Sequence, residues 1–442
     1  MRQHSLKVLL LCNRPVTNAD ASTITDHLDS FSTFSKHRIF SLSFLRDLPS
    51  RVDFSRFDVI VIHYTLALGY MRDHYISEAT KNRIKNFRGL KVAFIQDEYR
   101  NVDSVHDFLS QADMHILFTC VPEAEIEKVY PQQKLPNITK INTLTGYVPK
   151  NLLKVDPPNL KYRQIDVGYR TRKPPFWLGD LAQEKWTIAD KFRDAAKDFG
   201  LKIDLSYQET DRLYGQRWLA FVKNCRCMLG VESGASVFDF TGELQISVEK
   251  FVRQYPDATF EEIKAKFLAP YENLIKLNQI SPRCFEAAAL RTVMVLYVGD
   301  YSGILKPWRH FVPLEKDFSN FSEVLKFIKN DQEMQSMADR TFDEIASNEL
   351  YSYEYFIQHF DNVIFNEFNG RGFVKCRDPY SDNGFQLAKL TSLRYFFGKS
   401  ISITLQKLFL STFIRKWLYR LWQDLPPESR SFARPLLRWI GR

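Results

Sequence analysis

One stretch of the chain has residue types and spacing that could hold a nucleotide. Glu286 lies in a predicted helix that directly precedes the apolar strand predicted over residues 293–298, and the turn after that strand carries Tyr301, Ser302 and Gly303. In open α/β sheets, ligands bind at the loops beyond the carboxyl ends of the strands. We therefore expect Glu286 to accept hydrogen bonds from ribose hydroxyls and the loop amides to face a diphosphate. An ordinary amphipathic helix with a solvated Glu is the alternative.

The sequence around Glu286 resembles the E-A-x-A-x-G-x-P-V signature of GT-B glycosyltransferases of the group 1 type, which use nucleotide-sugars. Arg291 takes the place of the usual Gly, and Val293 takes that of the usual Pro. Members of this family often have another Glu eight residues upstream, where this chain has Asn278. The resemblance implies that Glu286 binds the donor ribose, but the upstream carboxylate's contact with the donor sugar is not carried over. The matching residues are Glu286, Ala287 and Ala289.

The same family has a glycine at the end of an upstream strand, then a basic residue and, about a dozen residues later, a Lys; both bases hold the donor diphosphate. Gly168, Arg170 or Arg172, and Lys185 are similar to that set. The chemistry requires such cations because a leaving nucleoside diphosphate develops negative charge, which fixed positive charges stabilise. The alternative is that Arg172 and its neighbour Lys173 are only the solvated charges of a loop.

Further candidates lie at the ends of other predicted strands. Glu232 and Ser233 begin the small-residue loop E-S-G-A-S, which we expect to line the cleft, with Glu232 among the catalytic residues; a well-capped helix start is the alternative. In the first half, Asp97 or Glu98 could act as a general base if transfer inverts the anomeric centre, and would bind acceptor if transfer retains it. A solvated strand-end charge is the alternative for each. The remaining acceptor-side candidates are His63 and Arg100.

Length and hydrophobic periodicity predict an α/β protein with two Rossmann-like, doubly wound domains, and the resemblance implies that these face a cleft, as in the GT-B fold. A chain of 442 residues exceeds what one core usually supports, and its apolar runs alternate with helix-length segments, as in parallel sheets. No G-x-G-x-x-G follows the first predicted strand, so the first half suits acceptor binding. We expect an N-terminal acceptor-side domain over 1–150, a nucleotide-sugar domain over 151–350, a crossover helix and link over 351–388, and a basic amphipathic tail over 389–442.

The net charge of +9 belongs to the predicted tail. Residues 389–442 hold eleven Lys or Arg and two acidic residues, so the rest of the chain is neutral, which argues against nucleic-acid binding by the body. Aromatic residues alternate with these bases, and charges interrupt every apolar run before it could span a bilayer. The tail therefore suits the surface of an anionic membrane, and a helical pair packed on the body is the alternative.

Six scattered cysteines form neither a disulfide framework nor a zinc-ligand pattern, which fits a reducing cytoplasm. We expect no cofactor and no metal. The sequence thus predicts a cytoplasmic glycosyltransferase, peripheral at the inner face of the membrane. It would move a sugar from a nucleotide-sugar to a glycan or lipid-linked acceptor, as in bacterial surface polysaccharide assembly. A GT-B-type nucleotide-sugar epimerase and a non-catalytic nucleotide- or sugar-binding membrane adaptor are the two alternatives.

Overall fold

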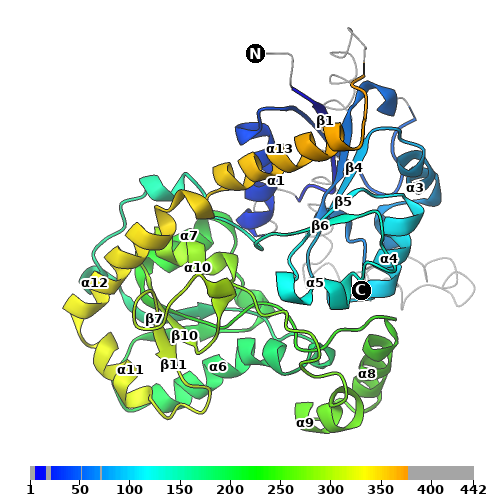
Figure 1. Ribbon diagram of the computed structural model, residues 1–442. Helices are drawn as coiled ribbons and strands as arrows, with labels where there is room; N and C mark the ends of the chain where they lie inside the picture. Colours follow the sequence, from blue (N-terminus) through cyan, green and yellow to red (C-terminus); the bar gives the residue numbers. More distant parts are fainter. Residues whose placement is uncertain (1–4, 16–20, 51, 70–71, 377–442) are drawn as a thin grey trace, which may run out of the picture.

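The computed structural model describes residues 5–15, 21–50, 52–69 and 72–376. They form two α/β domains, each built on one parallel sheet with helices on its faces (Figure 1). This arrangement confirms the predicted fold class. The tail predicted over 389–442 lies outside the described residues.

The N-terminal sheet has six strands in the order β2-β1-β3-β4-β5-β6, all parallel. Its central strands are continuous apolar runs because helices cover both faces of a parallel sheet. The strands are β1 (Lys7–Cys12), β2 (Arg38–Ser43), β3 (Val59–Ile62), β4 (Leu90–Ile95), β5 (Ile116–Thr119) and β6 (Thr139–Asn142). The helices are α1 (Ser22–Phe34), α2 (Arg72–Tyr75), α3 (Glu78–Lys85), α4 (Val102–Gln111) and α5 (Ile126–Val129).

The C-terminal sheet has five parallel strands in the order β11-β10-β9-β7-β8. Both sheets direct the carboxyl ends of their strands toward loops that carry the predicted site residues. The strands are β7 (Ile165–Arg170), β8 (Ile203–Ser206), β9 (Cys225–Gly230), β10 (Val293–Tyr297) and β11 (Val312–Leu314). The helices are α6 (Asp180–Ala196), α7 (Gly215–Asn224), α8 (Glu243–Gln254), α9 (Phe260–Ile263), α10 (Pro282–Ala289), α11 (Phe321–Ile328) and α12 (Asp331–Thr341).

The last described helix, α13 (Tyr353–Gly370), returns from the C-terminal domain to the N-terminal one (Figure 1). Phe356, Phe360 and Ile364 of α13 are buried in the same cluster as the apolar residues of β1, β3 and β4. The carboxylate of Asp361 accepts hydrogen bonds from the Ser35 hydroxyl and the Lys36 amide, both at 2.7 Å. The helix therefore closes one face of the N-terminal sheet, as the predicted crossover requires.

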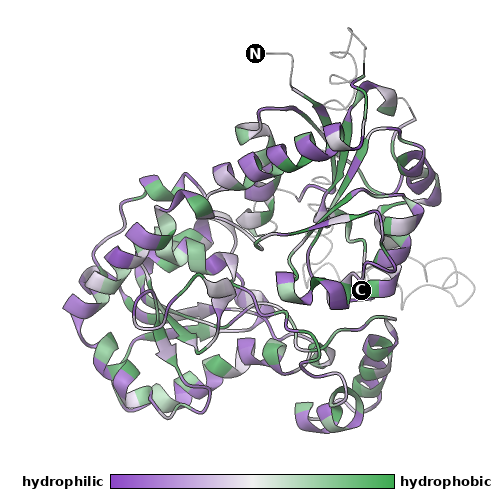
Figure 2. Ribbon diagram, in the orientation of Figure 1, coloured by the Kyte–Doolittle hydropathy of each residue, from purple (hydrophilic) through white to green (hydrophobic). Residues whose placement is uncertain are grey.

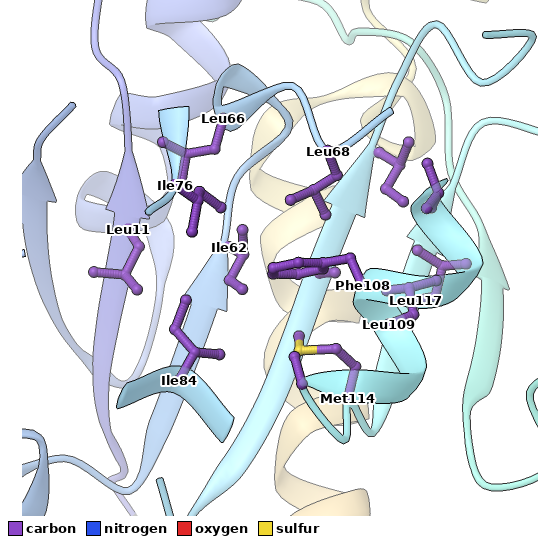
Figure 3. Packing of buried hydrophobic residues seen from close by; sticks show 14 of the residues in the cluster. Leu11, Ile62, Leu66, Leu68, Ile76, Ile84, Phe108, Leu109, Met114 and Leu117 are labelled. Carbon is purple, nitrogen blue, oxygen red and sulfur yellow. The ribbon is translucent and has the colours of Figure 1, made fainter. Parts of the chain in front are cut away.

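A segment of the C-terminal half completes the core on the other face of the N-terminal sheet. Phe238, Ile275 and Leu277 flank the insertion that contains α8 and α9, and they belong to the cluster that packs under α4. The backbone of Asp239 pairs with that of Tyr99 (N to O, 2.8 Å), and the Asp103 amide donates to the carbonyl of residue 240 at 2.9 Å. Figure 3 shows other members of this cluster, among them Leu11 and Ile62 of the sheet and Phe108 of α4.

Hydropathy follows the layers of both domains. Green, apolar strands lie inside, and the outer helices carry purple, polar faces (Figure 2). Within the described ranges, no helix has the length and apolar character needed to cross a membrane.

Candidate functional site

The helix that carries Glu286 begins beside the carboxyl edge of the C-terminal sheet. In α10, Ser281 is the N-cap residue and Pro282 occupies the first turn, both typical of a helix start. Glu286 is only 4% exposed, and its Oε2 accepts a hydrogen bond from Trp218 Nε1 at 2.8 Å. Burial raises the pKa of Glu286 to about 7, while the Trp218 bond and the charge of Arg283 oppose the rise. The solvated Glu offered as the alternative is therefore not what the structure contains.

A cavity of about 170 Å³ lies against Glu286 and between the two domains. The first turn of α1, which includes Ser22, forms its N-terminal wall. Tyr214, Trp218 and Arg283 line the C-terminal wall. A carboxylate in the wall of this cavity has the chemistry to accept hydroxyls from a sugar.

The charges that act on Lys185 are those of one acid, Asp97, and two further cations, Arg172 and Arg283. Burial lowers the pKa of Lys185 to about 8; Asp97 opposes that change, and the positive charges of Arg172 and Arg283 add to it. Lys185 is half-buried, and in the described part of the chain neither its ammonium nor the Arg172 guanidinium has a hydrogen-bond or ion-pair partner. Unpaired cations this close together repel one another, so their arrangement favours an anionic ligand.

Of the two arginines predicted for the diphosphate, Arg170 is engaged elsewhere. It forms an ion pair with Asp204 at 2.8 Å, and its guanidinium lies 4.3 Å from the centre of the Phe221 ring. Arg283 is the cation that sequence reasoning missed: it is exposed, lies over the Trp218 ring at 5.2 Å, and donates a hydrogen bond to the backbone carbonyl of residue 170. Its place in the first turn of the Glu286 helix was the available signal.

Glu232 is a buried acceptor of three hydrogen bonds. Oε1 accepts from the amides of Asp300 and Tyr301 at 3.1 and 2.9 Å, and Oε2 accepts from Asn278 Nδ2 at 2.7 Å. The residue is 6% exposed. Because N–H donors surround this carboxylate, we do not propose Glu232 as a nucleophile or base.

The polar groups of the loop after β10 form hydrogen bonds within the protein. The amides of Asp300 and Tyr301 bond Glu232, so they do not face a diphosphate as expected. The Tyr301 ring is fully buried, and its hydroxyl donates to the Tyr297 carbonyl at 2.6 Å. The hydroxyl of Ser302 accepts from the amide of residue 280 at 3.1 Å, whereas a side chain at Gly303 would meet open space. Ser233 pairs with Gln279 through two backbone hydrogen bonds of 2.8 and 2.9 Å.

A larger cavity, of about 660 Å³, lies on the N-terminal side of the cleft. Asp97 lies in its wall, is exposed, and accepts a hydrogen bond from the Tyr99 hydroxyl at 2.9 Å. Arg100 lines the same cavity and stacks over the Trp177 ring at 4.9 Å. Arg172 and Lys173 reach the cavity from the loop after β7. The structure thus brings Asp97, Arg100 and Arg172 to one space, from both domains.

The neighbouring acid, Glu98, is structural in its contacts. It is 2% exposed, and its two oxygens accept hydrogen bonds from the Thr119 hydroxyl, the Tyr130 hydroxyl and the Cys120 amide. Burial raises the pKa of Glu98 to about 7, although these hydrogen bonds oppose the rise. All three partners lie more than twenty residues away in sequence. Asp97 is therefore the acid of this pair that a substrate could reach.

His63 is fully buried at the end of β3 and does not line either cavity. Its Nδ1 accepts from the Thr65 amide at 3.2 Å, so Nε2 carries the proton and donates to Nδ1 of His27 at 2.9 Å. Burial lowers the pKa of both rings, to about 3 for His27. The pair joins α1 to the sheet and thereby positions the α1 turn opposite Glu286.

This histidine pair predicts sensitivity to acid. Below the ordinary pKa of 6.5 the unfolded chain binds a proton at His27 that the folded chain binds only near 3, so stability falls as pH falls through that window. The contribution of a single group reaches about 1.4 kcal/mol per pH unit.

His27→Asn, which keeps an acceptor for His63, is expected to lose less unfolding free energy between pH 7 and pH 5 than the wild type, as measured by urea titrations. The buried Glu98 and Glu286 have raised pKa values, so their contribution to the unfolding free energy grows as pH falls, opposite to that of His27. Because both glutamates are present in the wild type and in His27→Asn, the effect of His27 is read from the difference between the stability–pH curves of the two proteins. Parallel curves would contradict the assignment.

No family model matches the chain, and no curated protein does. Solved structures are similar to it at low identity. An alpha-glucosyltransferase in complex with UDP and DNA is 12% identical over 82% of this chain and 100% of that one, with a TM-score of 0.49. The T4 phage BGT in complex with UDP-glucose is 9% identical over 82% and 100%, with a TM-score of 0.46. Anabaena HepE in complex with UDP is 11% identical over 81% and 99%, with a TM-score of 0.43. The two facing parallel-sheet domains and the returning α13 have the arrangement of the GT-B fold.

Proposed function

We propose that the protein is a glycosyltransferase that uses a nucleotide-sugar donor. One observation carries the proposal: the positive charge of Arg283 acts both on the buried carboxylate of Glu286, in the wall of the smaller cavity, and on Lys185, a cation near Arg172 that has no partner in the described residues. A nucleoside diphosphate sugar has a partner for each of these groups. Its ribose hydroxyls can donate to the carboxylate, and its diphosphate can bind the cations. Negative charge grows on the diphosphate as the sugar departs, and preorganised cations stabilise it.

The roles follow from the contacts. Glu286 accepts hydrogen bonds from the ribose hydroxyls. Lys185, Arg172 and Arg283 bind the diphosphate. Asp97 meets the acceptor hydroxyl, as a general base if the configuration inverts and as a binding group if it is retained. The acceptor occupies the 660 Å³ cavity.

A panel of UDP, GDP, ADP, CMP and dTDP in thermal unfolding tests this proposal directly. One nucleotide is expected to raise the unfolding temperature, because a ligand that binds only the folded state stabilises it. The sugar derivatives of that nucleotide are then incubated without acceptor. Slow release of free sugar supports a transferase, an altered sugar still attached to the nucleotide indicates an epimerase, and binding without turnover indicates an adaptor. No shift with any nucleotide contradicts the donor site.

For the acceptor we propose a glycan or lipid-linked sugar of bacterial surface polysaccharide assembly, with the protein held peripherally at the inner face of the membrane. The basic and aromatic composition of residues 389–442 supports this finer proposal. Deleting 389–442 is expected to abolish sedimentation with vesicles that contain anionic lipid. Each basic residue near such a surface contributes about 1 kcal/mol, so raised salt should release the full-length protein as well. Failure of the full-length protein to bind anionic vesicles would contradict the membrane role. Equal binding to zwitterionic vesicles would contradict its electrostatic basis.

A further inference from the structure

The larger cavity has more positive than negative charge on its wall. Among the described residues, the carboxylic acids and bases that line it are Asp97, Glu98, Arg100, Arg172 and Lys173. Glu98 offers no accessible charge, because its side chain is 2% exposed and its two oxygens accept three hydrogen bonds inside the protein. Three cations and one exposed acid, Asp97, therefore remain.

Aromatic rings hold two of these cations. The Arg100 guanidinium lies 4.9 Å from the centre of the Trp177 ring, and Trp177 is fully buried. The Lys173 ammonium lies 4.3 Å from the centre of the Trp186 ring and 5.5 Å from that of Phe176. An aromatic face attracts a cation without neutralising its charge, so it positions a positive group that can still bind an anion.

The backbone beneath both cations is constrained. Lys173 precedes Pro174 and Pro175; a residue before proline is confined to extended conformations, and each proline fixes its own φ. Arg100 is anchored from the other half of the chain, because residues 100 and 239 form a β-bridge and the amide of Asp239 donates to the carbonyl of residue 99 at 2.8 Å. Groups on a constrained backbone lose less conformational entropy when they bind a ligand.

The cavity has more positive charge than donor binding requires. Lys173 is exposed, and within the ranges that the structure describes neither its side chain nor that of Arg172 has a hydrogen-bond or ion-pair partner. The proposed function places Arg172 on the donor diphosphate, which leaves Lys173 and Arg100 for a different anion. Arg100 follows β4 in the same loop as Asp97, so this anion and the hydroxyl that Asp97 meets would belong to one ligand.

The rest of the wall strengthens the attraction for an anion. A charge interacts more strongly beside apolar groups than in water, because the local dielectric constant is lower. The volume of about 660 Å³ is within the range of pockets that enclose small organic ligands. The apolar part of the wall includes Ile24, Leu68, Phe94, Val105 and Leu178.

We propose that the acceptor is anionic: Arg100 and Lys173 bind a carboxylate or phosphate group of the acceptor glycan while Asp97 meets its hydroxyl. This inference rests on the proposed transferase function and adds the chemical class of the acceptor. The planar fork of Arg100 can donate to two oxygens of such a group at once, and Lys173 adds a point charge. The oxyanion is either the carboxylate of a uronic acid or the phosphate that links a sugar to a lipid carrier.

Sugar binding to the protein with its donor site filled tests the charge directly. The protein is saturated with the nucleotide that the thermal panel identifies, so that Lys185 and Arg172 are occupied. It is then titrated calorimetrically with glucose, galactose and mannose, each as the free sugar, the uronate and the 6-phosphate. At least one anionic sugar is expected to bind about tenfold or more tightly than its neutral counterpart, because hydrogen bonds to charged groups are the strong ones. A preference for uronates indicates a carboxylate, and one for 6-phosphates indicates a phosphate.

Lys173→Met should reduce this preference about tenfold and leave the affinity for the neutral sugar unchanged, because only the charge is lost. Damage to the loop would instead weaken both sugars alike. Lys161→Met is the matched control: Lys161 is also exposed and lies over an aromatic ring, that of Tyr162, at 4.9 Å, but it lines neither cavity.

Arg100→Lys supplies a second, independent variant. It keeps the positive charge and loses the planar fork, so it should weaken the anionic sugar more than Lys161→Met does. Raised salt should lower the preference in the wild type as well.

The outcomes separate this inference from the proposed function. A wild-type protein that binds the nucleotide, but binds no anionic sugar more tightly than the neutral one, overturns the anionic acceptor alone. A preference that persists unchanged in both Lys173→Met and Arg100→Lys also overturns it, because the anion would then be bound elsewhere. A wild-type protein that binds no nucleotide overturns the proposed function, and the acceptor assignment is lost with it.

Discussion

Glu286→Gln is expected to weaken nucleotide binding about 10- to 100-fold while leaving the fold intact. Gln can still accept the hydrogen bond from Trp218 Nε1, but its NH₂ cannot accept from ribose hydroxyls. Hydrogen bonds to charged groups contribute about 1.5–3 kcal/mol, which corresponds to that loss of affinity. Glu286→Ala is a poorer test because the buried Trp218 N–H would lose its partner.

Calorimetric titration with the nucleotide measures this effect. Glu323→Gln, on the exposed first turn of α11, is the matched control and should bind like the wild type. Equal affinities for Glu286→Gln and the control would refute the ribose assignment.

The same residue gives kcat/KM a pH dependence. Because burial raises the pKa of Glu286 to about 7, its ionised fraction grows as pH rises through 7, and kcat/KM should rise with it. Lys185, with a pKa lowered to about 8, loses its charge above that value, so kcat/KM should fall again. The nucleotide-sugar is the ligand to use, since the terminal phosphate of a free nucleotide itself titrates near about pH 6. Glu286→Gln should remove the acidic limb of the curve and leave the basic one.

Lys185→Met is expected to lower kcat/KM by about 10²–10³ and to raise the unfolding temperature of the unliganded protein. The loss of rate is the size found when one preorganised group that stabilises developing negative charge is removed. The gain in stability follows because burial disfavours the charged form of Lys185 and Arg172 and Arg283 repel it, and the attraction of Asp97 does not offset these two effects. Activity and stability should therefore move in opposite directions.

The control for Lys185→Met is Lys197→Met, at the exposed C-terminal end of the same helix. It should change neither kcat/KM nor the unfolding temperature appreciably. A Lys185→Met protein that is both less stable and fully active would show that Lys185 serves the fold and not a phosphate.

Sequence reasoning found the elements that carry strong periodicity. The apolar runs of β1, β4 and β10 and the crossover α13 were predictable because a buried parallel strand or an amphipathic helix leaves a clear pattern. β6 was missed: three of the four residues of Thr139–Asn142 are polar, and the strand is partly exposed at the edge of the sheet. No alternation distinguishes such a strand from a loop.

The chemical types of the candidate site could be predicted from the sequence, and its individual residues less so. Glu286 and Lys185 could be singled out from motif and spacing. The sequence could not exclude Glu98 and Arg170 from the candidate site. Their partners, Tyr130 for the hydrogen bond and Asp204 for the ion pair, are distant in sequence. A strand-end charge looks the same in sequence whether it faces a cleft or a buried partner. Only the tertiary contacts separate the two cases.

The residues that complete the N-terminal core from the other half have a consequence for how the protein is made. Phe238, Ile275 and Leu277 are translated long after residue 150, yet they are buried beneath α4. A fragment that stops at residue 150 would leave an apolar surface open to water, and we expect it to aggregate when expressed alone. We therefore expect the first half to complete its core during synthesis only after residue 277 has been made.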